Sequence, residues 1–161
     1  VTFRRTVIPV QELLDAAGKY FKKLMKNRPE RIELEIESME AKVIGDVNQL
    51  RFLLENLIDE ALTVREDGVI RLQARKDNEY IRFLFTDTRR EKSVEELNQL
   101  FYPNLARMTA GEKGELRGTE YLVCKQIIRD HDEFAGRRGC RINAEPAEGG
   151  GFTVYFTIPR R

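Results

Sequence analysis

Apolar residues near the start of the chain are spaced as on a helix and then as on a strand. Between residues 10 and 26 they recur every three or four positions, which is typical of one buried helix face. These positions are Val10, Leu13, Leu14, Ala17, Phe21 and Leu24. Residues 31–37 alternate strictly between charged and apolar side chains and predict a half-buried strand. Residues 42–45 are expected to form a short strand beside it.

The middle of the chain predicts a second helix followed by a β-hairpin. Asp46 suits a helix N-cap, and the run from residue 47 to 64 is rich in Leu and Phe without Gly or Pro. Residues 69–75 and 80–86 have the pattern of two strands. The pair Asp77–Asn78 between them suits a tight hairpin turn.

The last third predicts further helices and strands around an aperiodic segment. Ser93 and Glu96 form a capping box, which predicts a short helix over residues 93–101. Residues 102–118 contain Pro103 and three glycines, and we expect a mobile loop there. The remaining predicted elements are a helix over 119–129 and two strands over 140–145 and 152–158, joined by the glycines at 149–151.

These elements together predict one α/β domain over residues 1–161. The expected architecture is a two-layer sandwich of about three helices on a mixed, mostly antiparallel sheet. The chain carries 28 basic and 27 acidic residues, and its net charge of +1 gives no electrostatic case for a nucleic-acid partner. No apolar run is long enough to span a bilayer, so we expect a cytoplasmic domain that makes no membrane contact.

The cysteine and histidine content argues against a zinc cluster and against a disulfide framework. Cys124 and Cys140 lack the spacing of a zinc site, and His131 is the only histidine, expected at a helix end. The chain begins with Val1 rather than Met, which suggests a fragment of a longer protein and leaves a membrane anchor elsewhere in that protein open.

Six short strings, in order along nearly the whole chain, resemble the ATP-binding domain of sensor histidine kinases. They are residues 45–50 (GDVNQL), 55–61 (ENLIDEA), 85–88 (FTDT), 97–101 (LNQLF, similar to a phenylalanine box), 123–128 (VCKQII) and 156–159 (FTIP). This domain, the Bergerat fold of the GHKL superfamily, is shared with gyrases, a heat-shock chaperone and mismatch-repair ATPases. The resemblance implies ATP and Mg²⁺ as cofactors. It also implies two partners outside this chain, a histidine-containing dimerisation domain and a response regulator.

The resemblance also implies roles for particular residues. Asn56 and Glu60 lie four apart on a predicted helix, at positions where the family's amide side chains hold Mg²⁺ and phosphates. Asp87 stands where the family's carboxylate reads the adenine amino group. Gly118 matches a glycine before the helix that faces the phosphates, and Lys113 and Arg117 are candidate phosphate contacts in the lid. The alternatives are polar residues on a solvated helix face, a strand-end turn residue and solvent-exposed lid cations.

Several of the family's residues are replaced. Arg89 and Glu91 stand at the two glycines of the family's Asp-x-Gly-x-Gly run. An arginine there could pair with a phosphate, but we expect these charged side chains to be solvated. Glu60 replaces the second asparagine, and Glu120 replaces a lid glycine and adds negative charge beside a polyphosphate. No catalytic residue is assigned.

Three functions remain open on the sequence. The first is a pseudokinase-type module with weak or absent nucleotide binding, favoured by the lost glycines. The second is a working kinase domain that passes the γ-phosphoryl group of ATP to a histidine on a separate domain, favoured by Asn56 and Asp87. The third is an α/β protein-interaction domain.

Overall fold

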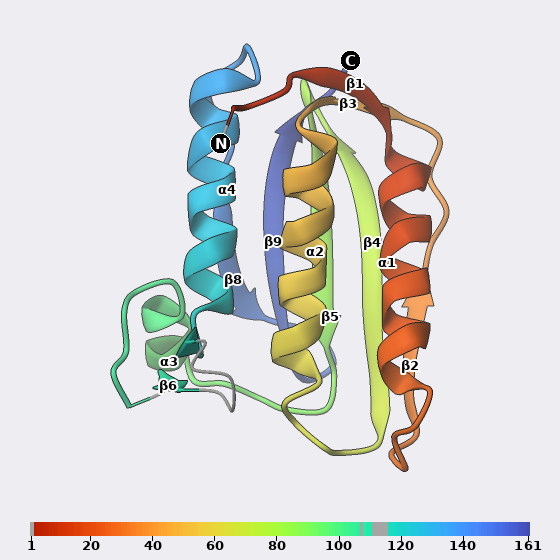
Figure 1. The fold of residues 1–161 in the computed structure, drawn as a ribbon, viewed down its shortest axis with the longest axis vertical. Helices are drawn as coiled ribbons and strands as arrows, with labels where there is room; N and C mark the ends of the chain where they lie inside the picture. Colours follow the sequence, from red (N-terminus) through yellow and green to blue (C-terminus); the bar gives the residue numbers. More distant parts are fainter. Residues whose placement is uncertain (1, 107, 111–115) are drawn as a thin grey trace.

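The computed structural model describes residues 2–106, 108–110 and 116–161, and it confirms the predicted α/β sandwich (Figure 1). The helices are α1 (Val10–Met25), α2 (Val47–Ala61), the short α3 (Val94–Gln99) and α4 (Glu120–Phe134). The strands are β1 (Thr6–Pro9), β2 (Ile32–Ile36), β3 (Lys42–Gly45), β4 (Gly68–Asp77), β5 (Tyr80–Asp87), β6 (Thr109–Ala110), β7 (Leu116–Arg117), β8 (Ile142–Pro146) and β9 (Phe152–Pro159).

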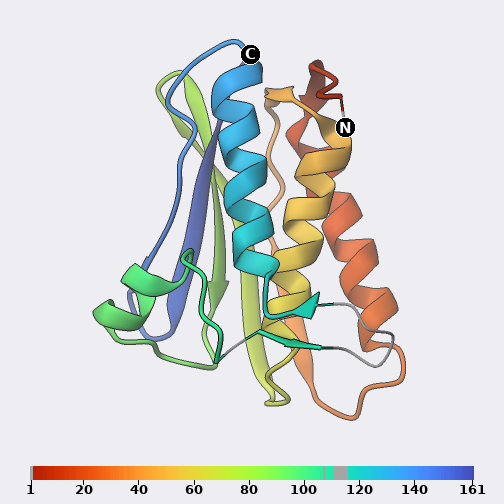
Figure 2. The ribbon, with the colours of Figure 1, turned by 60° about the vertical axis from the view of Figure 1, so that its left-hand side comes forward.

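The main sheet is mixed and mostly antiparallel, as predicted. Its strand order is β2-β4-β5-β9-β8, with only the β2–β4 pair parallel. Helices α1, α2 and α4 lie side by side on one face of this sheet (Figures 1 and 2). Period-two alternation turns apolar side chains of the strands toward these helices. At the centre, Phe83 and Phe156 are directly paired across β5 and β9 and stack with ring centroids 4.8 Å apart.

Local signals placed most element ends correctly. Asp46 caps α2 by accepting a hydrogen bond from the Gln49 amide at 3.1 Å. The capping box of Ser93 and Glu96 is present at α3. Asn78 adopts the left-handed conformation, with φ of 55°, in the β4–β5 turn, where such a conformation is needed.

Several expectations were wrong in pairing or extent. The strand at 42–45 does not lie beside residues 32–36: β3 pairs antiparallel with β1, a strand that was not predicted, in a separate two-stranded sheet. Helix α4 continues five residues beyond the predicted end, to Phe134. The expected loop over 102–118 contains the short β6–β7 pair. None of the described helices is long and apolar enough to cross a membrane.

A buried histidine joins α4 to the start of α2. His131 lies in the last turn of α4, as expected of a helix-end residue, and is fully buried. Its Nε2 accepts a hydrogen bond from the Asp46 amide at 3.0 Å, and its Nδ1 is 2.8 Å from the Ile127 carbonyl oxygen. This pattern requires a neutral ring with the proton on Nδ1, because Nε2 is an acceptor. Burial lowers the pKa of His131 below its usual value.

The lowered pKa of His131 predicts a loss of stability in mild acid. Below pH about 6.5, His131 binds a proton in the unfolded chain but not in the folded chain. The free energy of unfolding therefore falls by up to about 1.4 kcal/mol per pH unit. Above that pH, histidine is neutral in both states and contributes its full stability. Urea unfolding between pH 7.5 and 5.5 measures this, with the non-titrating variant His131→Gln as the control. An equal pH dependence in both proteins would contradict the assignment.

Candidate functional site

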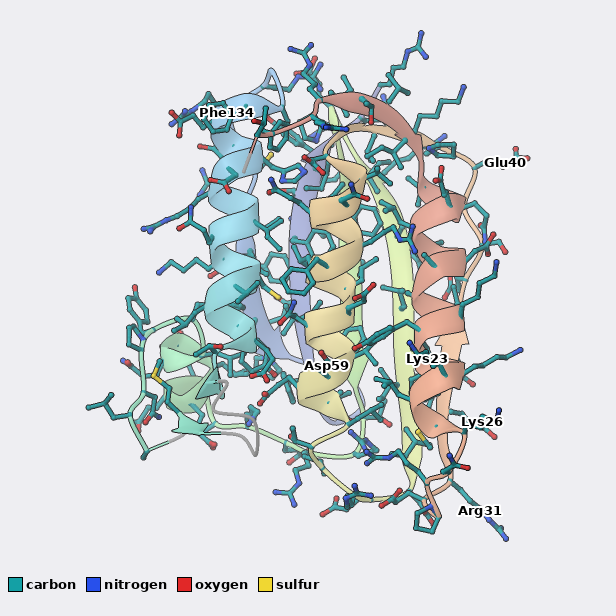
Figure 3. All side chains as sticks on the ribbon, in the orientation of Figure 1. Lys23, Lys26, Arg31, Glu40, Asp59 and Phe134 are labelled. Atoms are coloured by element: carbon teal, nitrogen blue, oxygen red, sulfur yellow. The ribbon has the colours of Figure 1, made fainter. Side chains whose placement is uncertain are left out.

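The residues implied by the resemblance gather at the end of the sandwich where α2 ends and α4 begins. Asp87 is the last residue of β5 and is buried. Asn56 and Glu60 lie one turn apart near the end of α2. Asp59, the residue before Glu60, is labelled in Figure 3. Gly118 lies just before α4, with φ of 82°. The fold therefore brings these four positions to one end of the molecule.

The other two predicted residues cannot be placed at this site. Lys113 lies outside the described residues. Arg117 belongs to β7, and its side chain lies outside the described part of the structure. Their role as phosphate contacts stays a prediction.

Arg89 was expected to be solvated, and this was wrong: its side chain is only 1% exposed and pairs with Asp87. Its Nε donates to Asp87 Oδ1 at 2.9 Å, and its Nη2 donates to Oδ2 at 2.9 Å. The Arg89 backbone amide also donates to Oδ1 at 3.0 Å. Both carboxylate oxygens are therefore engaged by a residue two positions further along the chain. Glu91, in contrast, is exposed, as expected, and Arg90 is 53% exposed and pairs with Glu66.

The remaining Arg89 donors bind main-chain carbonyls after α2. Nη1 donates to the carbonyl oxygens of Val64 at 2.8 Å and Glu66 at 2.9 Å. Nη2 also donates to the carbonyl oxygen of Ala61, the last residue of α2, at 2.6 Å. All five N–H bonds of the guanidinium thus have acceptors, which is what a fully buried arginine requires. A cation at this position also complements the negative end of the α2 dipole.

Gly68 makes room for the Arg89 stem. A Cβ on Gly68 would lie 2.6 Å from Arg89 Cγ, and its φ of 144° is unfavourable for other residues. The glycine at the start of β4 and the arginine after β5 therefore fit together. Any larger residue at position 68 would push the guanidinium away from Asp87.

Polar groups on α2 and α4 face each other with a surplus of carboxylates. Asn56 Nδ2 donates to the Phe52 carbonyl of its own helix at 2.8 Å. Asp59 accepts a hydrogen bond from the Tyr20 hydroxyl at 2.5 Å. Burial raises the pKa of Asp59, the Tyr20 hydrogen bond partly opposes this, and the Glu120 carboxylate raises it further. One oxygen of Glu120, Oε2, is buried without a hydrogen-bond partner.

Neither metal nor thiol chemistry is assembled by the described residues. Among them, no group of three or more His, Cys, Asp or Glu side chains is arranged to hold a metal ion. Cys124 and Cys140 are free and buried, and burial raises the pKa of Cys140 to about 12. A thiol with so high a pKa is a poor nucleophile at neutral pH.

The predicted phenylalanine box is part of the core beside the site. Leu97, Leu100 and Phe101 are buried, and the Phe101 ring meets Tyr121 of α4 edge-on, with centroids 5.7 Å apart. This contact anchors α3 to the start of α4. Helix α3 is thus held against the same end of the sandwich as Asp87.

The two-layer sandwich, with helices on one face of a mixed five-stranded sheet, is the fold of histidine-kinase-like ATPase domains. Residues 45–161 match the family described as histidine kinase-, DNA gyrase B- and HSP90-like ATPase, and the chain belongs to that family. No curated protein sequence matches the chain.

Solved structures with the same fold include histidine kinase catalytic domains. The catalytic domain of histidine kinase ThkA is 21% identical with a TM-score of 0.73, and the match covers 99% of this chain and 98% of that one. The mycobacterial sensor histidine kinase MprB is 18% identical with a TM-score of 0.74, over 98% and 99% of the two chains. Full-length ShkA, solved with AMPPNP, is 16% identical with a TM-score of 0.74, and the match covers 99% of this chain and 32% of ShkA.

Proposed function

We propose that this chain is a degenerate histidine kinase ATP-binding domain that acts in two-component-type signal transduction with weak or absent nucleotide binding. The observation that carries the proposal is the Arg89–Asp87 pair, since Asp87 is the residue expected to read adenine. The guanidinium lies along the carboxylate edge that an adenine amino group would approach. The chain thus supplies its own donor to this carboxylate.

Magnitudes favour Arg89 over a nucleotide as the partner of Asp87. A hydrogen bond from the adenine amino group to a carboxylate is worth about 1.5–3 kcal/mol. Breaking a buried ion pair by removing one partner costs about 3–5 kcal/mol. Moving Arg89 aside would also leave the carbonyls of Ala61, Val64 and Glu66 without this donor. Adenine binding would therefore cost more than it gains.

The phosphate end of the expected site is also unfavourable to ATP. Glu60 and Glu120 place carboxylates where the family has neutral side chains, and they repel a polyphosphate that carries no metal. Asn56 keeps one ligand of the expected Mg²⁺ site, with Glu60 as its candidate neighbour. These residues fit ATP-Mg poorly.

The proposed role depends on partners rather than on chemistry in this domain. The candidates are a histidine-containing dimerisation domain and a response regulator, both outside this chain. ThkA has been solved in complex with the response regulator TrrA, and its catalytic domain has the fold of this chain. We infer that this domain acts by contacts with such partners, in the cytoplasm.

Isothermal titration calorimetry with an ATP analogue, with and without Mg²⁺, tests the proposal. We expect no heat of binding and no change in melting temperature at millimolar nucleotide. A working kinase domain would instead be stabilised by about 3 kcal/mol at a hundredfold excess over Kd. Magnesium-dependent binding in the micromolar range would overturn the proposal in favour of a functional ATP-binding domain. Asp87→Asn should then abolish binding, and persistence of binding in that variant would mean that adenine lies elsewhere.

A further inference from the structure

Basic residues from four separate segments meet at the end of the molecule that carries both termini. This end lies opposite the Asp87 site, and Figures 1 and 2 show the termini, the β1–β3 pair, the β4–β5 turn and the end of α4 together there. We call it the basic end, and define it as Arg4, Arg5, Lys42, Arg137, Arg138, Arg141, Arg160 and Arg161. It holds eight of the 28 basic residues of the chain.

Direct contacts hold these segments together. Arg137 Nη1 donates to the carbonyl oxygens of Glu79 at 2.6 Å and Arg160 at 3.4 Å. The Arg161 amide donates to the Lys42 carbonyl at 3.0 Å. The Arg5 guanidinium lies against Gly136, where a Cβ would be 2.9 Å from its Cζ. The cluster is therefore built by the fold and is invisible in the net charge of the chain.

Most of these charges have no acidic partner. Arg137 pairs with Glu79 at 3.7 Å, and Arg138 pairs with Asp132 at 3.3 Å. The side chains of the other six form no ion pair with a described acidic residue. Of the nearby acids, Asp46 is buried as a helix cap and Asp77 pairs with Arg82, which leaves Glu40 and Glu133 exposed against the six cations. The surface is therefore strongly positive.

Exposed apolar groups accompany the charges. Phe134, at the end of α4, is 50% exposed, and its ring centroid lies 5.7 Å from that of Phe3 (Figure 3). A hollow beside Lys42 is lined by apolar and polar residues, namely Pro9, Met39 and Ala41 together with Gln11, Ser38 and Glu40. Cations combined with an exposed aromatic ring are typical of proteins that bind at a lipid surface, where the ring enters the headgroup boundary. Nucleic-acid surfaces need the cations but gain little from the apolar part of this hollow.

We infer that the basic end binds anionic lipid headgroups, with Phe134 inserted among them. This goes beyond the proposed function and departs from the expectation of no membrane contact, which rested on the absence of an apolar run long enough to span a bilayer. A juxtamembrane basic residue contributes about 1 kcal/mol of attraction to an anionic surface, which is about fivefold in affinity. Six unpaired cations on one face suffice for reversible docking, and docking orients the Asp87 site away from the lipid.

Co-sedimentation with vesicles tests the inference. The chain should bind vesicles of phosphatidylcholine containing about one-third phosphatidylglycerol and not vesicles of phosphatidylcholine alone. The triple variant Arg5→Gln, Arg141→Gln, Arg161→Gln should bind about 100-fold more weakly, at about fivefold per charge. Phe134→Ser should weaken binding about fivefold, since a half-buried ring would be lost from the interface.

The matched control neutralises three cations at the opposite end. Lys23, Lys26 and Arg31 lie there (Figure 3), and changing all three to Gln should leave vesicle binding unchanged. Equal loss in both triple variants would mean that only overall charge matters and would overturn the site. Absence of binding to the anionic vesicles, or tighter binding to duplex DNA at the same phosphate concentration, would overturn the lipid assignment. None of these outcomes depends on nucleotide, so they are independent of the proposed function.

Discussion

Replacing Arg89 with methionine is expected to lower the free energy of unfolding by about 3–5 kcal/mol. Methionine retains a long apolar stem against Gly68 but leaves the Asp87 carboxylate buried without its ion-pair partner. It also removes the donors to the carbonyls of Ala61, Val64 and Glu66. For a domain of this size, the melting temperature should fall by roughly 10 °C. Urea unfolding monitored by circular dichroism gives the free energy directly.

A double-mutant cycle separates the ion pair from the packing. Asp87→Asn should also destabilise, because the buried guanidinium loses its counter-charge. The double variant should be less destabilised than the sum of the two single variants by at least about 1 kcal/mol, because it leaves no lone buried charge. Arg90→Met is the matched control, because Arg90 is exposed and its pair with Glu66 should be worth no more than about 1 kcal/mol. Equal effects of Arg89→Met and Arg90→Met would refute the buried pair.

Features set by neighbouring residues were predictable from the sequence. The Asp46 cap, the capping box at α3 and the Asn78 turn each depend on residues within four positions of one another. Their backbone geometry follows from local hydrogen bonding, so sequence spacing is enough to identify them. The positions of α1, α2 and the main-sheet strands follow equally from periodicity.

Features set by distant contacts were not predictable in this way. Strand β1 is short and mostly exposed, so it lacks an apolar pattern, and it is defined by pairing with β3 more than thirty residues away. Helix α4 extends past His131, and the ring of His131 accepts a hydrogen bond from the distant Asp46 amide. Without that partner, the polar run around His131 has the pattern of a helix end.

The expectation for Arg89 failed for the same physical reason. Arginine is usually exposed because burying it requires five acceptors, and no local pattern in the sequence supplies them. Here they come from the carboxylate of Asp87 and from three carbonyls at the end of α2 and just beyond it. The one available signal in the sequence was the position of Arg89. It lies two residues after Asp87 at the end of one strand, and the neighbouring strand begins with Gly68. A lost family glycine thus indicated a changed residue but not where its side chain would go.

Restoring the family residues should restore nucleotide binding, and the order in which they are restored matters. Arg89→Gly exposes the Asp87 carboxylate and removes the competing donor, while Glu60→Asn and Glu120→Gly remove two negative charges from the phosphate end. Removing a competitor worth about 3–5 kcal/mol should raise affinity by about two to three and a half orders of magnitude, at about tenfold per 1.4 kcal/mol. The triple variant should therefore bind an ATP analogue with Mg²⁺ in calorimetry, whereas the original chain should not.

The partial variants identify which end of the site excludes ATP. The double variant Glu60→Asn, Glu120→Gly should give no heat of nucleotide binding, because Arg89 still pairs with Asp87. Arg89→Gly alone should bind the analogue weakly, and its lowered melting temperature should rise on nucleotide addition, because the adenine amino group then replaces the lost donor. Adding Asp87→Asn to the triple variant should abolish binding and serves as the control, with circular dichroism verifying that each variant is folded. If the two glutamate substitutions alone restore binding, carboxylate repulsion and not Arg89 keeps nucleotide out.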